Sequence, residues 1–532
     1  MKLGIDARRI ALVVVTMLAL VGSSGCAIIE RIVQTTSGEV PEGNALLSSM
    51  DGTGRYVVFS SGMSGLVAGP DTHQQEVYRR DMYTGVTQRV STGMGGTAAN
   101  GQSGVFPSSI SDGGRYVVFQ SQATNLVPGD DNGSADIFVR DMVSGTTEPA
   151  SIALDGTVPN ADSGFSSLSA DGRFVAFESA ATDLTADPIP PGSSRLYVRD
   201  RQLGTTTMIT STSMLLGLVR LSADGSTIVF STDDNSLVPG DTGGWDTFVV
   251  DVATHAVERI DVDSNEVEAD HTAFLQPLSA ALSADGTLVA FESAAPNLVP
   301  GDTNGEIDIF VRDRVLGTTE RVDVTSTGQQ GTDTSRGATG SIEIDRSGRT
   351  VAFVTGAALA PGDPGNLDAY VRDRTLGRTT WVSTTDHLGV ANDWAYRVAI
   401  SADGRLLAWE TPATNVSGPE PVFRFGTSHV FVRGTLTPEI IRTTPASLAP
   451  GTSTRVTVFG HGFRPGTQLS SGPGVSLSSI LIAGDGALKV TVTVAPGATA
   501  GPRDLSVTSA ALGPDGLGVV ATTCAACIQI GT

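Results

Sequence analysis

Two acidic loops have residue types and spacing that could bind calcium. Each holds an Asp, an Asn two positions later and a second Asp four positions after that. The residues are Asp130, Asn132 and Asp136 in DDNGSAD, and Asp302, Asn304 and Asp308 in DTNGEID. Calcium prefers side-chain oxygens, but the late bidentate Glu of a helix-loop-helix calcium loop is missing here. Backbone carbonyls or water would therefore have to complete the coordination.

The same letters also predict simple turns. Asn-Gly favours a tight turn, and Asp side chains cap backbone amides around such turns. Corresponding segments elsewhere in the chain are degenerate, reading DTGGWD, DPGNLD and DPIPPGSSR. We therefore expect turns at both loops and no cofactor, with calcium as the alternative.

The N-terminus predicts export. Residues 1–25 read as a lipoprotein-type signal peptide, in which a basic start precedes a twelve-residue apolar run, 10–21, that is too short to span a bilayer. The following SSGC resembles the lipobox of bacterial lipoproteins, although Ser23 stands where that pattern usually has Leu. Cys26 would then be acylated, which would hold the protein on the extracytoplasmic face of the cell membrane or envelope.

The other two cysteines, Cys524 and Cys527, form a CxxC pair. Two thiols supply only half of a four-ligand zinc site, and no His lies near them in sequence. In an exported chain we expect a local disulfide.

Several function classes lack support in the sequence. The net charge is −22 and no basic run follows the first ten residues, which argues against a nucleic-acid partner. The nucleophile motif GxSxG, the zinc motif HExxH and a phosphate-binding glycine loop do not occur. We expect no catalytic residue, and we expect the isolated histidines to lie on the surface. These are His73, His255, His271, His387 and His429.

A repeat of 53 to 62 residues organises most of the chain. Its first half reads like SADGRFVAFES and is anchored by an aromatic residue; its second half reads like DIFVRD and leads into a Thr-rich segment such as TTERV. The anchoring aromatics are Phe59, Phe119, Phe177, Phe230, Phe291, Phe353 and Trp409. Each repeat holds about four short strands. Seven such repeats predict a seven-bladed β-propeller.

Two details refine this prediction. The Asp that ends each third strand is expected to accept hydrogen bonds within the next turn; these are Asp81, Asp141, Asp200, Asp251, Asp313 and Asp373. The seventh repeat lacks its fourth strand, and IERIV at residues 29–33 matches VERID at residues 257–261. We therefore expect the N-terminal segment to close the ring.

The SADGRYVAF and DIFVRD signature resembles the TolB-like propeller repeat, which is related to the WD repeat, and it places the propeller at residues 26–436. Residues 437–532 change to alternating strands and Pro/Gly turns, which predict a β-sandwich. PGTSTRVTVFGHGFRPGT resembles the IPT/TIG immunoglobulin-like fold. The expected fold class is all-β, a propeller followed by a sandwich.

The propeller resemblance implies a binding or scaffolding platform, because such propellers include envelope proteins that bind partner proteins. The partner would be a protein or a cell-envelope polymer, and the membrane would be reached through a lipid anchor. Two alternatives stay open: an envelope glycan hydrolase or lyase with carboxylates in the propeller funnel, and a structural surface protein that mediates adhesion.

Overall fold

The computed structural model describes residues 30–69, 72–82, 84–190, 193–210, 218–270, 279–332, 341–385, 389–416, 428–434, 439–461, 468–482, 487–509 and 520–531. These residues form β-strands and two short 3₁₀ turns, η1 (Met94–Gly96) and η2 (Asp112–Gly114). The all-β prediction is confirmed. The signal peptide and Cys26 lie outside the described residues.

Seven four-stranded antiparallel sheets are present in the described residues up to Gly434, and we number them blades 1 to 7 in chain order. Blade 1 has β2 (Ala45–Met50), β3 (Tyr56–Ser61), β4 (Glu76–Asp81) and β5 (Val86–Arg89). Blade 2 has β6 (Ser109–Ile110), β7 (Tyr116–Ser121), β8 (Asp136–Asp141) and β9 (Thr146–Pro149). Blade 3 has β10 (Ser163–Leu168), β11 (Phe174–Ser179), β12 (Arg195–Asp200) and β13 (Thr205–Met208).

The remaining sheets keep the same strand order. Blade 4 has β14 (Val219–Leu221), β15 (Thr227–Thr232), β16 (Asp246–Asp251) and β17 (Val257–Arg259). Blade 5 has β18 (Ala280–Leu282), β19 (Leu288–Ser293), β20 (Asp308–Asp313) and β21 (Thr318–Arg321). Blade 6 has β22 (Ile342–Ile344), β23 (Thr350–Thr355), β24 (Asp368–Asp373) and β25 (Arg378–Trp381). Blade 7 has β26 (Val398–Ile400), β27 (Leu406–Thr411), β28 (His429–Gly434) and β1 (Glu30–Arg31).

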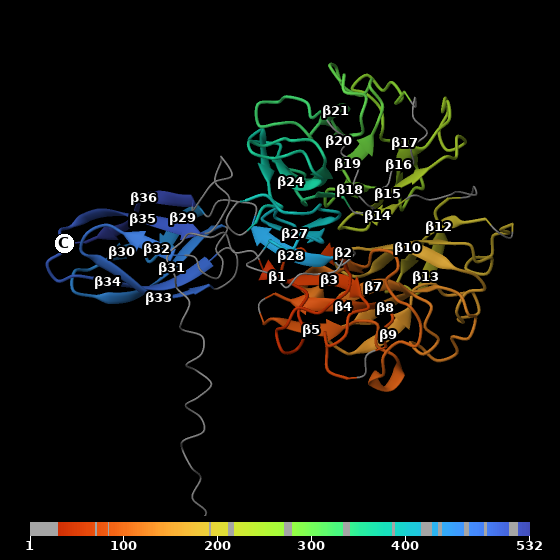
Figure 1. Cartoon of the computed structure of the whole chain (residues 1–532), viewed down its shortest axis with the longest axis horizontal. Helices are drawn as coiled ribbons and strands as arrows, with labels where there is room; N and C mark the ends of the chain where they lie inside the picture. The colour runs from red at the N-terminus through yellow and green to blue at the C-terminus, as the bar shows by residue number, and fades with distance from the viewer. Residues whose placement is uncertain are drawn as a thin grey trace, which may run out of the picture.

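The blades stand around one axis (Figure 1). The first strand of each blade contacts the first strand of the next, and β26 of blade 7 contacts β2 of blade 1. Because each sheet buries both of its faces against its neighbours, β-branched and aromatic residues fill these strands.

The anchoring aromatics predicted from the sequence are fully buried. Each faces an aromatic side chain on the third strand of its own blade, with ring centroids 5.6 to 6.1 Å apart. The pairs are Phe59–Tyr78, Phe119–Phe138, Phe177–Tyr197, Phe230–Phe248, Phe291–Phe310, Phe353–Tyr370 and Trp409–Phe431. Such pairs add about 0.5–1.5 kcal/mol each to the burial of their area.

Blade 7 combines both ends of the propeller sequence. β1 pairs antiparallel with β28, with Glu30 opposite Val432 and Arg31 opposite Phe431. The Ile32 amide then donates to the Val430 carbonyl at 2.9 Å. The side chain of Ile32 is fully buried in a hydrophobic cluster shared by blades 7 and 1.

The C-terminal domain is a sandwich of two sheets. One sheet has the order β29 (Glu439–Thr444), β31 (Ser453–His461), β34 (Ala487–Val494) and β33 (Val475–Ile482). The other has the order β30 (Ser447–Leu448), β36 (Val520–Ile530), β35 (Gly501–Ser509) and β32 (Gln468–Ser471). Both sheets contribute to one core, which includes Val456, Val490, Leu505 and Ile528.

No helix among the described residues is long and apolar enough to cross a membrane.

Pairing of β1 with β28 generates a stability prediction. Ile32→Asp places a charge in the cluster between blades 7 and 1, and should lower the free energy of unfolding by at least about 3 kcal/mol. Chemical denaturation followed by tryptophan fluorescence measures this change. Thr36→Asp, at an exposed position four residues later, is the matched control and should change stability little. Equal stability of the Ile32 variant and wild type would show that β1 does not hold the ring.

Candidate functional site

One face of the propeller carries a circle of short turns at the axis. We call it the turn face, and we call the turns between the first and second strands of each blade the axial turns. Their second positions are small residues in five blades, Gly52, Ala170, Ala223, Ala284 and Ala402. In the other two blades this position holds Asp112 and Arg346.

Backbone hydrogen bonds join these turns to one another. The Asp112 amide donates to the Ala170 carbonyl at 2.8 Å, and the Ala170 amide donates to the Ala223 carbonyl at 2.8 Å. Similar bonds continue through blades 5, 6 and 7 to blade 1, where the Ala402 amide donates to the Gly52 carbonyl at 2.9 Å. The turns are therefore held in fixed positions before any ligand binds.

The two large residues meet across the axis. Arg346 Nη2 of blade 6 forms an ion pair with Asp112 Oδ1 of blade 2. Gly52 makes room for this pair, because a Cβ at that position would overlap Asp112 Oδ1 and would lie 3.0 Å from Arg346 Nη2. Both paired side chains are more than one third exposed, so the pair sits at the surface of the turn face.

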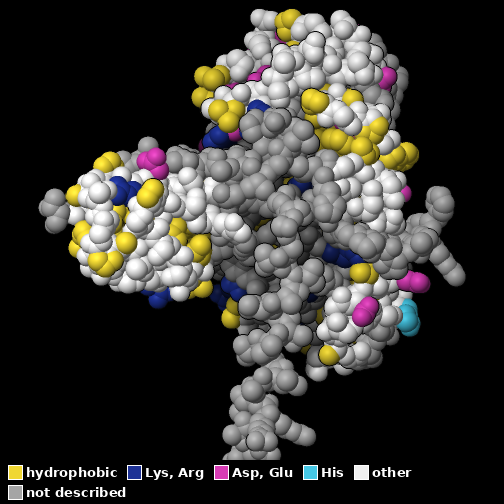
Figure 2. Space-filling view, turned by 60° about the vertical axis from the view of Figure 1, so that its left-hand side comes forward, with side chains coloured by type: hydrophobic (Ala, Val, Ile, Leu, Met, Phe, Trp, Pro, Cys, Tyr) yellow, Lys and Arg dark blue, Asp and Glu magenta, His cyan; other side chains and the backbone are white. Residues whose placement is uncertain are grey.

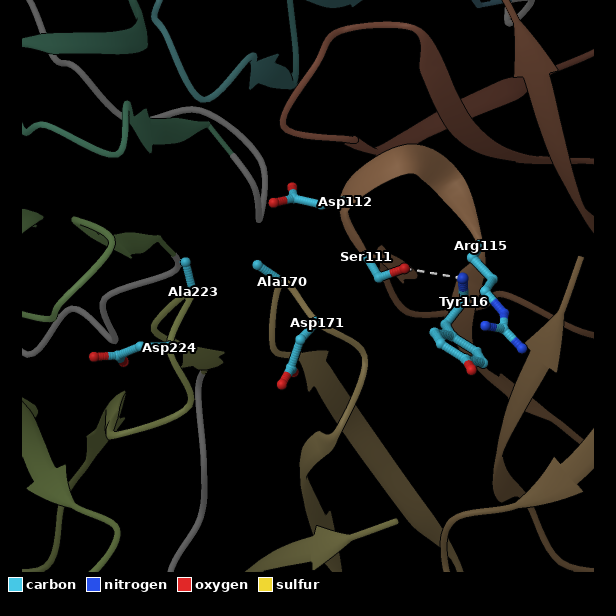
Figure 3. Close-up of a pocket in the computed structure, with 8 residues that line it drawn as sticks. All are labelled: Ser111, Asp112, Arg115, Tyr116, Ala170, Asp171, Ala223 and Asp224. Carbon is cyan, nitrogen blue, oxygen red and sulfur yellow. Dashed lines mark hydrogen bonds between the residues drawn. The ribbon is translucent and has the colours of Figure 1, made fainter. Parts of the chain in front are cut away.

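A hollow of about 450 Å³ opens beside this pair (Figure 3). It is lined by the axial turns of blades 2, 3 and 4, and its residues are Ser111, Asp112, Arg115, Tyr116, Ala170, Asp171, Ala223 and Asp224. Three carboxylates from three neighbouring turns face this hollow or its rim, which makes it acidic.

Hydrogen bonds within the turns fix these side chains. Ser111 Oγ accepts from the Tyr116 amide at 2.9 Å, so this serine serves the turn. Asp171 Oδ1 accepts from Ser169 Oγ at 2.6 Å. Burial would raise the pKa of Asp224, but hydrogen bonds from Ser222 and Ser226 outweigh it and lower the pKa. Asp224 is therefore an ionised carboxylate near neutral pH.

The arginine in the hollow, Arg115, interacts with a carboxylate and with an aromatic ring. Arg115 donates through Nε and Nη2 to Asp141 at 3.2 and 2.8 Å, and its guanidinium lies over the Tyr116 ring. These hydrogen bonds lower the pKa of Asp141. The same clamp recurs as Arg55–Asp81, Arg173–Asp200 and Arg349–Asp373.

The prediction for the Asp after each third strand is confirmed. Asp141 Oδ1, for example, accepts from the Val143 amide at 2.9 Å, and the other five accept from amides of their own turns. Sequence reasoning missed the arginine partners, because the clamp joins residues 24 to 27 positions apart in loops of varying length.

The two acidic loops form turns in which the Asn side chain makes hydrogen bonds within its own loop. Asn132 Nδ2 donates to Asp136 Oδ2 at 2.8 Å, while its Oδ1 accepts from the Ser134 amide at 2.8 Å. Asn304 Nδ2 likewise donates to Asp308 Oδ1 at 3.0 Å. Asp302 and Asp308 both face Arg321, at 3.3 and 3.2 Å.

The structure shows where two cysteines and three of the histidines named in the sequence analysis lie. Cys524 and Cys527 are joined by a disulfide within β36. His73 and His255 are exposed. The surface prediction is wrong for His429, which is fully buried, so that burial and the nearby Arg31 charge lower its pKa to about 4. His271 and His387 lie outside the described residues.

One half-buried acid stands apart from the hollow. Burial raises the pKa of Glu343, on the inner strand β22, to about 7, against an opposing effect of the Arg220 charge. On the described part of the face seen in Figure 2, hydrophobic side chains form small separate groups. The described part of this face therefore has no broad apolar surface that would mark a binding site.

The family model for domain III of the quinohemoprotein amine dehydrogenase alpha subunit, an immunoglobulin-like β domain, matches residues 437–515. No curated protein matches the chain.

Among solved structures, TolB from Acinetobacter baumannii matches with 13% identity over 63% of this chain and 62% of its own, at a TM-score of 0.36. This chain thus covers less than two thirds of that TolB. The propeller domain of the Trilobed protease from Pyrococcus furiosus matches with 10% identity over 70% of this chain and 92% of its own, at a TM-score of 0.42. A putative TolB from Agrobacterium tumefaciens matches with 16% identity over 62% of this chain and 90% of its own, at a TM-score of 0.31. The fold assignment rests on the sheets described above.

The Arg–Asp clamp generates a pH-dependent prediction. Asp141→Asn removes the charge that Arg115 binds, and should lower the free energy of unfolding at pH 7 by less than the Ile32 substitution does. The pKa of Asp141 is lowered in the folded state, so its contribution is complete above the unfolded value of about 4 and is lost as pH falls below it. The difference between variant and wild type should stay constant from about pH 7 to 5 and shrink below about pH 4.

Urea denaturation over this pH range measures the difference. Asp131→Asn, at an exposed position in the loop before β8 of the same blade, is the control and should match wild type throughout. A loss that is the same at pH 3 and pH 7 would show that Asp141 acts through shape and not through charge.

Proposed function

We propose that this protein is an exported, lipid-anchored binding platform that holds a protein or a cell-envelope polymer at the axial hollow of its turn face. The observation that carries this proposal is the hollow itself, built from turns of three blades that backbone hydrogen bonds already hold in place. A site that is ordered in advance loses little entropy on binding.

Electrostatics favour a cationic group on the ligand. Asp112, Asp171 and Asp224 line the hollow. Arg115, the one cation of the lining, is already neutralised by Asp141. Asp112 is likewise neutralised by Arg346, so Asp171 and Asp224 leave the hollow net negative. This charge favours a Lys or Arg side chain, or an amino group of a polymer.

The position of β1 bears on where the ligand is bound. β1 runs antiparallel to β28, so the first residue of β1 lies beside the end of β28. In the other blades, this side carries the turn between the third and fourth strands, as between β20 and β21. That side is the turn face. Glu30 lies four positions after Cys26, a span of at most about 14 Å in an extended chain. An acylated Cys26 would therefore keep the hollow close to the membrane.

A glycosidase needs a general acid with a raised pKa beside a second carboxylate. Hydrogen bonds lower the pKa of Asp224 in the hollow, which is the opposite of this requirement. Glu343 has a raised pKa but does not line the hollow. Binding is thus the function that the hollow supports better than catalysis.

Site-specific photocrosslinking tests the proposal. A benzoylphenylalanine at Ala223, in the membrane-anchored protein in its native cells, should capture one dominant species. The same probe at Leu154, which is 66% exposed in the loop between blades 2 and 3, is the matched control and should capture only background.

Charge variants sharpen this test. The double variant Asp171→Asn and Asp224→Asn keeps an acceptor oxygen for each turn and should reduce capture at least tenfold, whereas Glu343→Gln should leave it unchanged. Equal capture at both probe positions, or no capture at Ala223, would contradict the proposal.

A further inference from the structure

The turns between the third and fourth strands carry the most exposed large hydrophobic side chains of the described residues. Val143, Val315, Leu316 and Leu203 are 78, 76, 73 and 68% exposed, and Leu376 is 64% exposed. A single exposed hydrophobic residue needs no explanation, but here four blades repeat it in the same turn. These turns, which we call the outer turns, are residues 142–145, 201–204, 314–317 and 374–377.

The outer turns lie at a common level on the turn face. Each follows the capping Asp of a third strand, and in all four blades that Asp pairs with the first residue of the second strand. An outer turn therefore stands beside the axial turn of its own blade. Because neighbouring strands lie about 4.8 Å apart, the outer turns are about 10 Å farther from the axis than the axial turns. Their five hydrophobic side chains form an incomplete ring around the hollow, which we call the apolar rim.

Hydrogen bonds fix the backbone of the apolar rim. Asp313 Oδ1 accepts from the Val315 and Leu316 amides at 3.0 and 2.8 Å. The same bond to the capping Asp is made by the amides of Val143, Leu203 and Leu376. The fold thus holds these side chains in contact with water as long as nothing covers them, which is unfavourable for apolar groups.

Arginines stand beside the apolar rim. Arg115, Arg173 and Arg349 clamp the capping Asp of blades 2, 3 and 6, and their side chains are 52, 36 and 45% exposed. Each clamp is a neutral pair, although the chain as a whole carries a charge of −22. Apolar side chains flanked by partly exposed arginines suit the headgroup region of a bilayer. There the apolar group enters the acyl boundary while the guanidinium stays among the phosphates.

The N-terminal end of β1 lies on the same face as the apolar rim. β1 takes the place of the fourth strand in blade 7, and Glu30 stands opposite Val432, near the end of β28. Cys26 precedes Glu30 by four positions, so it lies within about 14 Å of this point. An acyl chain on Cys26 would thus enter a membrane that faces the apolar rim. This position of the anchor selects a lipid bilayer as the partner of the rim.

We propose that the turn face lies on the lipid bilayer that holds the Cys26 anchor, and that the apolar rim enters the headgroup region of this bilayer. The inference rests on the proposed function, because it uses the lipid anchor. It also narrows that function, since a ligand of the hollow would have to be carried at the membrane surface. Blade 4 does not contribute, because its turn holds the small or polar residues Ala253, Thr254 and His255. Leu154, in a loop between blades on the opposite face, stays in water.

Fluorescence of the tethered protein tests this orientation. In the full mature chain a hexahistidine tag replaces Cys26, and vesicles of phosphatidylethanolamine, phosphatidylglycerol and a nickel-chelating lipid bind the tag. Leu203→Cys carries a nitrobenzoxadiazole label, because the two remaining cysteines are joined in the disulfide. Tethering should raise the emission of this label at least about twofold and shift it to shorter wavelength, since the label enters a less polar region. The same label at Leu154→Cys is the matched control and should not respond.

Charge variants show whether the rim itself makes the contact. Leu316→Asp together with Leu376→Asp should reduce the response at Leu203→Cys at least about twofold without changing the melting temperature, whereas Leu154→Asp should leave the response unchanged. The inference is overturned if Leu203→Cys does not respond, if Leu154→Cys responds equally, or if the double variant keeps the full response. Because the tag replaces the lipid, these outcomes depend neither on acylation nor on a ligand of the hollow. Photocrosslinking at Ala223 tests the proposed function separately.

Discussion

Six backbone hydrogen bonds around the axis are the constraint on which the rest of this propeller depends. They join the axial turns of all seven blades into a circle that is open only between blades 1 and 2 in the described residues. Bonds of this length require the turns to approach closely, and this requirement explains the Gly and Ala residues at their second positions. Where two larger residues occur, Asp112 and Arg346, they satisfy each other across the axis. The radial stacking of the sheets, and the hollow on the turn face, follow from this spacing.

Features that repeat could be predicted from the sequence, and features that occur once could not. The aromatic of each repeat identified the second strand, and the Asp after each third strand identified a turn cap, because seven or six copies reveal a common role. The Asp112–Arg346 pair joins residues 234 positions apart, and no local pattern marks it. The burial of His429 was missed for a related reason. It stands where five of the other blades have an acid, and only the register of β28 with β27 shows this. The loops at Asp130 and Asp302 look alike in sequence, and the residues that separate them chemically, Pro149 and Arg321, come from a strand 13 positions beyond the second Asp.

The first residue of the third strand occupies the same backbone position in every blade, but its side chain and the partners of that side chain differ from blade to blade. A buried carboxylate at the start of the third strand is costly unless a cation or hydrogen bonds accompany it. Blades 1, 4 and 5 supply an arginine, blade 6 supplies a serine, and blade 3 replaces the acid altogether. Because the surrounding strands keep the same pairing, the chemical differences between blades are due to side chains and not to backbone shape.

The antiparallel pairing of β1 with β28 also decides how the molecule responds to a mechanical load. In the other six blades the third and fourth strands are joined by a turn, whereas in blade 7 the two strand ends are open and lie side by side. One continues into the N-terminal segment and the other into the C-terminal sandwich. A pull between these two parts acts on adjacent ends of one strand pair, so its hydrogen bonds would break one after another, as in a zipper, instead of sharing the force in shear. Tension would therefore open blade 7 first and leave the other six blades unloaded.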